Sequence, residues 1–76
     1  MMKLSQLDID LLLAAQKRGM SHASMLKRDF FGDRFEVLLV AKNEVMAREG
    51  INFLPNAITL KISDILQQCA SDNNTD

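Results

Sequence analysis

The sequence predicts a mainly α-helical fold of three to four short helices, with a short strand near residues 57–62, that dimerises. Apolar residues recur at spacings of three and four along two long segments, which is the spacing of one helix face. One later segment instead alternates apolar and polar residues, which is typical of a strand. Because a lone strand needs a mate, and a symmetry-related copy could supply it, we expect a homodimer.

Length and composition limit how the chain can be stabilised. Its 76 residues make one domain, which we expect at residues 1–70, with 71–76 as a disordered tail that lacks apolar side chains after residue 70. A core this small usually needs a disulfide, a metal or a partner. With one cysteine, Cys69, and one distant histidine, His22, we expect no disulfide within the chain, no metal and no cofactor. An apolar content of 47% therefore favours burial against another chain.

The lack of a long apolar run predicts a cytoplasmic protein, and the charge pattern predicts a surface with charges of both signs. No apolar run has the length of a signal peptide core or a membrane span, and a single cysteine fits a reducing compartment. The net charge of −1 argues against a general polyanion binder. Residues 11–28 nevertheless carry basic and no acidic side chains, either as ordinary solvated surface or as a contact to phosphate or an acidic partner. These candidates are Lys17, Arg18, Lys27 and Arg28.

The first helix is predicted over residues 4–18. Ser5 and Asp8 are spaced as in a capping box, and Gly19 can adopt the left-handed conformation that ends a helix. Apolar residues cover more than half of its circumference, which exceeds the needs of one packing face.

Two further helices are predicted in the middle of the chain. Ser21 would cap a helix that reaches Phe30 and uses Phe30 and Phe31 as apolar contacts, and Gly32 would break it. Asp33 would cap a third helix that ends at Gly50.

The C-terminal part of the sequence has a different pattern from the predicted helices before it. Residues 52–56 form a loop that contains the only proline, and residues 58–62 alternate as in a strand. A last helix would then follow a cap at residues 63–64, although one continuous helix over residues 56–69 is the alternative.

The parts of an active site are missing from the sequence pattern, so we expect no enzyme. Cys69 has no histidine near it, and Asp8 and Asp10 would point to different sides of a helix. The three glycines are isolated, which excludes a phosphate-binding glycine loop.

A DNA-binding helix-turn-helix around Gly32 also fits poorly. Its two helices would need a small residue where Arg28 stands and an apolar one at Lys27. Acidic residues in segment 33–36 would repel phosphates at the start of the reading helix.

Apolar helix faces remain as the candidate functional surface, together with the alternating strand. The expected dimer or partner contacts are Leu4, Leu7, Leu11, Leu12, Phe35, Leu39, Val40, Met46, Ile58 and Leu60.

Residues 7–17, Leu-Asp-Ile-Asp-Leu-Leu-Leu-Ala-Ala-Gln-Lys, resemble the opening of the FlhD family of flagellar transcription-activator subunits. The first helix of that family carries Ile-Asn-x-x-x-Leu-Leu-Leu-Ala-Gln-Arg. Looser similarity continues over segments 23–28, 35–41, 46–49 and 58–62. The chain departs from the family in a longer loop around Pro55, in having no cysteine in the strand, and in lacking most of the C-terminal helical region. Relatives on mobile elements that regulate conjugation genes share the plan.

The resemblance implies a homodimeric subunit that pairs with a larger, zinc-binding, FlhC-like partner responsible for much of the DNA contact. We therefore expect a non-enzymatic subunit of a transcription regulator that acts through protein–protein contacts and meets nucleic acid only within a complex. The alternative is a small adaptor or anti-activator of phage or plasmid type, which binds a host regulator without touching DNA. A third hypothesis is a protein that binds DNA without a partner.

Overall fold

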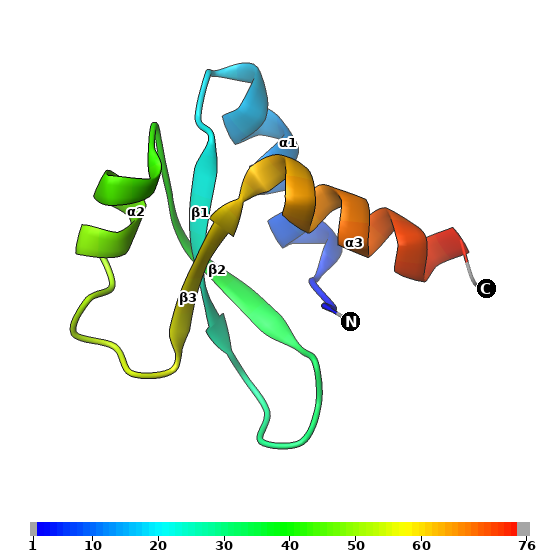
Figure 1. Ribbon diagram of the computed structural model, residues 1–76. Helices are drawn as coiled ribbons and strands as arrows, with labels where there is room; N and C mark the ends of the chain where they lie inside the picture. Colours follow the sequence, from blue (N-terminus) through cyan, green and yellow to red (C-terminus); the bar gives the residue numbers. More distant parts are fainter. Residues whose placement is uncertain (1, 75–76) are drawn as a thin grey trace.

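The structure is a computed structural model that describes the backbone of residues 2–74 and the side chains of residues 2–69. It contains a three-stranded antiparallel sheet with β1 between β2 and β3, and helices on both of its faces (Figure 1). The elements in chain order are α1 (Gln6–Lys17), β1 (His22–Lys27), β2 (Phe35–Ala41), α2 (Glu44–Glu49), β3 (Ala57–Lys61) and α3 (Ile62–Asn74).

The predicted mainly α-helical class is therefore wrong, because the fold is α+β. The segment predicted as the second helix forms β1, and the front of the predicted third helix forms β2, so that only α2 at its end is helical. The predicted strand is confirmed as β3, which excludes the continuous helix over residues 56–69. Its mate is β1 of the same chain, so the argument for a dimer from an unpaired strand no longer holds.

The first helix is confirmed together with both of its ends. The Asp8 N–H donates to Ser5 Oγ at 3.2 Å, which satisfies one of the open donors of the first turn. Gly19 has a φ of +91°, a backbone conformation that a residue with a Cβ rarely adopts.

A β-bulge explains why the sequence of β2 imitates a helix. Ser24 pairs with Leu39 and Met25 pairs with Val37, so Leu38 has no partner on β1. The extra residue shifts the alternation by one, and as a result Val37 and Val40 both pack against the main core. Their spacing of three is also the spacing of neighbours on a helix face.

The main core lies between the sheet and the pair α1 and α3. The buried members of this cluster are Met2, Leu12, Ala15, Ala23, Met25, Ile62, Ile65 and Cys69. On the opposite face α2 buries Ala47, whose carbonyl accepts a hydrogen bond from the buried Ser24 hydroxyl at 2.6 Å. Because adjacent strand residues point to opposite faces, β1 serves both layers.

The short helix α2 begins with an asparagine cap that the sequence analysis did not identify. Asn43 Oδ1 accepts the Met46 N–H at 2.9 Å, whereas the predicted cap, Asp33, lies in the loop between β1 and β2. The helix ends at Gly50 as predicted, but with a φ of −67° instead of a left-handed cap. Ile51 packs back and is buried.

The described C-terminal end of the chain is helical. α3 continues to residue 74, so the predicted tail begins inside its last turns, and residues 75–76 lie outside the described part of the chain. Among the described residues, no helix has both the length and the apolar character needed to cross a membrane.

Candidate protein-interaction site

The structure divides the predicted contact residues into a buried group and an exposed group. Leu12 is fully buried in the core, so a partner of the folded chain cannot reach it. Partly buried residues are Leu4, Phe35, Leu39, Val40 and Leu60. Exposed residues are Leu7, Leu11, Met46 and Ile58.

The four basic candidates are exposed but do not form one surface. Lys17 and Arg18 lie at the C-terminal end of α1, whereas Lys27 ends β1 and Arg28 follows it. The strand β1 lies between the two pairs along the chain, and its five steps of about 3.3 Å make it roughly 16 Å long. Arg28 Nε also lies 3.2 Å from Glu36 Oε2, which neutralises part of its charge.

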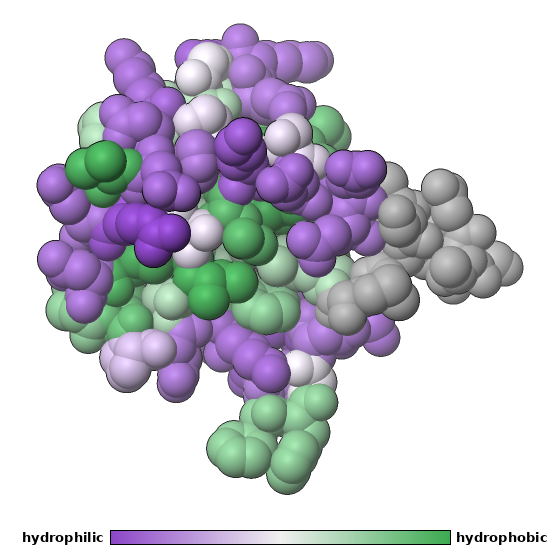
Figure 2. All heavy atoms as spheres, viewed as in Figure 1, coloured by the Kyte–Doolittle hydropathy of each residue, from purple (hydrophilic) through white to green (hydrophobic). Residues whose placement is uncertain are grey.

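The loop between β1 and β2 exposes two adjacent phenylalanines. Phe30 is 86% exposed and Phe31 94% exposed, and their rings meet edge to face with centroids 4.7 Å apart. Figure 2 shows an apolar, green projection at the lower end of the molecule, where Figure 1 places the tip of this hairpin. A large aromatic side chain contributes little stability while it is exposed to water, but its burial in a partner's pocket is favourable. The tip is therefore a candidate contact site.

The hairpin tip is held by polar contacts at its base. The Arg28 N–H donates to the Arg34 carbonyl at 2.9 Å and closes the loop. The Asp29 carboxylate accepts the Arg34 N–H at 3.2 Å and lies against Gly32. The aromatic pair therefore projects from a defined turn.

Replacing Gly32 with alanine should disturb this turn. A Cβ at position 32 would overlap the Asp29 carboxylate, so the carboxylate must move away and lose its hydrogen bond from the Arg34 N–H. We expect a loss of about 1 kcal/mol in the free energy of unfolding, measured by urea denaturation. In an Asp29→Ala background the same substitution should cost much less, and an equal cost in both backgrounds would contradict the contact.

A cleft at the base of the hairpin brings several predicted contact residues together. It has a volume of about 620 Å³ and lies between the N-terminal segment and the strands. Its lining includes four predicted residues, namely Leu4, Leu7, Phe35 and Arg28. Because Leu7 is exposed there, one partner could cover both the cleft and the hairpin tip.

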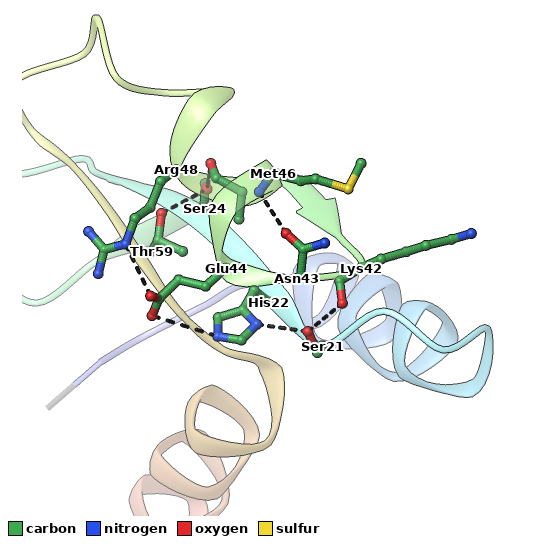
Figure 3. Close-up of polar contacts among 10 residues, drawn as sticks. Ser21, His22, Ser24, Lys42, Asn43, Glu44, Met46, Arg48 and Thr59 are labelled. Atoms are coloured by element: carbon green, nitrogen blue, oxygen red, sulfur yellow. Dashed lines mark hydrogen bonds and ion pairs between the residues drawn. The ribbon is translucent and has the colours of Figure 1, made fainter.

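A polar cluster at the other end of the sheet has the residue types of a hydrolase triad (Figure 3). Ser21 Oγ lies 2.7 Å from His22 Nδ1, and His22 Nε2 lies 3.9 Å from Glu44 Oε1. Arg48 Nε lies 3.6 Å from the other oxygen of the same glutamate. The sequence analysis did not identify this group, because it joins β1 to the start of α2.

The hydrogen bonds of Ser21 argue for a structural role of that cluster. Its hydroxyl donates to the Lys42 carbonyl at 2.7 Å, so His22 Nδ1 must donate to the oxygen and cannot take its proton. The Ser21 N–H donates to the Ala41 carbonyl, and its own carbonyl accepts the Ile62 N–H. Ser21 thus ties β1 to both neighbouring segments.

The sequence pattern predicts a helix that includes Phe30, so it does not identify the two phenylalanines as an exposed site. Asp29, Gly32 and Asp33 around them are turn-forming residues, and this composition is the signal that could have predicted a hairpin. Within the described part of the chain, no three histidine, cysteine, aspartate or glutamate side chains gather where they could hold a metal ion. Comparisons of the chain with protein-family models, with curated proteins and with solved structures found no match.

Proposed function

We propose that this protein is a non-enzymatic adaptor that binds a larger protein by inserting its hairpin tip into an apolar pocket. The observation that carries the proposal is the pair of neighbouring phenylalanines at 86% and 94% exposure on a hydrogen-bonded turn. Aromatic side chains that fill a partner's pocket dominate the binding energy of many interfaces. The adjoining cleft, with the exposed Leu7, would extend the contact area.

Between the two regulatory roles, the adaptor that does not touch DNA has more support. A shared DNA contact needs its basic side chains on one surface, and here they stand in two separated pairs. The link of the partner to transcription rests on the sequence resemblance alone. Segments 23–28 and 35–41, which resemble the next two helices of that family, lie in or around the strands β1 and β2, so a helical fold does not hold for them.

Site-specific photo-cross-linking tests the proposal in the native cell. The photoreactive residue p-benzoylphenylalanine would replace Phe31 at the hairpin tip, and in a matched control it would replace Phe53, which is 73% exposed in another loop. We expect one protein to cross-link from position 31 and not from position 53, with mass spectrometry as the readout. Equal capture from both positions would contradict the proposed site. A salt-dependent shift of duplex DNA by the purified chain would support a DNA binder instead.

A further inference from the structure

The strand β3 forms one edge of the sheet. A hydrogen bond of the next residue, Ile62, shows which residues of β3 direct their backbone groups toward β1. The Ile62 N–H donates to the Ser21 carbonyl, just ahead of β1, at 2.8 Å. Because the direction alternates along a strand, Leu60 and Ile58 face β1 with their backbone groups, as Ile62 does. The backbone N–H and C=O groups of the residues between them point away from the sheet.

Those outward residues are Ala57, Thr59 and Lys61. The Ala57 N–H is already used, since it donates to the Leu54 carbonyl at 3.3 Å. For the N–H groups of Thr59 and Lys61, the described chain provides no hydrogen-bond acceptor. An edge with open donors is a template for another strand.

The opposite edge of the sheet is covered along its first part, from residue 33 to residue 37, so the two edges differ there. The Lys3 N–H donates to the Asp33 carbonyl at 2.8 Å, and the Phe35 N–H donates to the Lys3 carbonyl at 2.9 Å. Farther along, the Asp8 carboxylate lies 3.5 Å from the Val37 nitrogen. These contacts occupy outward groups of β2 that could otherwise pair with a second chain.

A groove runs along the open edge. Its volume is about 690 Å³, and α2 and the following loop contribute one wall through Arg48, Ile51, Asn52 and Leu54. Four consecutive residues, 57–60, line the rest. Because consecutive strand residues point to opposite faces, a groove touched by all four lies against the edge itself.

We propose that a second copy of this chain occupies the edge, with the two β3 strands paired antiparallel about Thr59. The two sheets would join into one sheet of six strands, in the order β2-β1-β3-β3-β1-β2. This inference does not rest on the hairpin tip, so it can hold or fail independently of the proposed function.

The backbone groups of β3 are complementary to themselves in this register. Each Thr59 N–H would donate to the carbonyl of Thr59 in the other copy, and each Lys61 N–H to the carbonyl of Ala57. The Ala57 N–H, which is already bonded to Leu54, is the donor that this register leaves unused. On the core-side face of the sheet, Ile58 would lie opposite Leu60 of the other copy, an apolar pair of the kind that stabilises strand pairing.

Other registers of the same pairing fit less well. A shift that centres the contact on Lys61 would place two lysines opposite each other, and like charges in that position destabilise a sheet. A shift that centres it on Ala57 would require the N–H that already donates to Leu54. The self-complementarity of this single register is why the proposed occupant is a second copy instead of an unrelated peptide.

Light scattering and analytical ultracentrifugation of the full chain test the dimer. Since the interface is of modest size, we expect reversible dimers that form between low micromolar and high micromolar concentration. Ile58→Lys should raise the dissociation constant about tenfold or more, because the lysine would face an apolar side chain. Leu38→Lys is the matched control, since Leu38 is 39% exposed on β2 and Ile58 is 38% exposed.

Cross-linking tests the register. A Thr59→Cys variant should form a covalent dimer with a short bismaleimide, whereas Leu38→Cys should not. The unmodified chain is the blank, because its only cysteine, Cys69, is buried. A monomer at the highest concentration, a dimer that Ile58→Lys leaves unchanged, or equal cross-linking from positions 38 and 59 would each overturn the proposal.

Discussion

Replacing Leu12 with alanine is expected to unfold most of the protein at room temperature. Leu12 is fully buried at the centre of the core between α1, α3 and β1. Removing a buried leucine side chain costs about 2–5 kcal/mol, and a core of this size rarely supplies more than roughly 3–5 kcal/mol. Far-UV circular dichroism of the variant should show a largely disordered chain at a temperature where the unchanged protein is folded.

The neighbouring Leu11 provides the matched control for that experiment. It is 46% exposed on the same helix, so Leu11→Ala removes the same atoms from a half-solvated position. Because alanine favours helix at both sites, the difference between the variants reports burial and not helix propensity. We expect the Leu11 variant to lose less than about 1 kcal/mol in urea denaturation. Equal losses would contradict the orientation of α1.

The helix α1 could be predicted from the sequence because its signals are local. Ser5 and Gly19 mark its ends, and their roles depend only on residues within a few positions. The stretch between them keeps the apolar spacing of a helix and is longer than a typical strand. The same reasoning found β3, because residues 58–62 alternate strictly, although a continuous helix over residues 56–69 was the alternative.

The strand β1 could not be predicted because its residues prefer a helix. Its sequence, His-Ala-Ser-Met-Leu-Lys, has no β-branched or aromatic residue, whereas alanine, methionine, leucine and lysine favour helices. Pairing with strands on both sides overrides this preference, and those pairs are distant in sequence. Ser24 shows the consequence, since its burial depends on the carbonyl of Ala47, 23 residues away.

The candidate site was predicted only in part, for a related reason. Leu4, Leu7, Phe35 and Arg28 were expected as contacts, but the cleft that joins them exists only because Lys3 pairs alongside β2. The phenylalanine tip requires a hairpin, and a helix predicted over the residues of β1 is incompatible with that hairpin. Exposure is a property of the folded chain, so an apolar count cannot distinguish Leu12 from Phe31.

Replacing Phe30 and Phe31 together with serine is expected to abolish binding to the cross-linked partner without unfolding the domain. Both side chains are almost entirely in solvent, so the free energy of unfolding should change by less than about 0.5 kcal/mol. Truncating an aromatic anchor in a partner's pocket commonly costs about 2 kcal/mol, so two additive losses correspond to an affinity ~1,000-fold lower. Isothermal titration calorimetry with the purified partner measures this loss.

Phe53→Ser is the matched control, because Phe53 is also an exposed loop phenylalanine but lies between α2 and β3. If the hairpin tip is the anchor, the Phe53 variant binds like the unchanged chain, and each single substitution at position 30 or 31 gives an intermediate affinity. The two single losses need not add up to the double loss, because the rings contact each other at 4.7 Å. If the double variant keeps full affinity, or if Phe53→Ser weakens binding equally, the apolar tip is not what the partner recognises, and the adaptor proposal loses the observation that carries it.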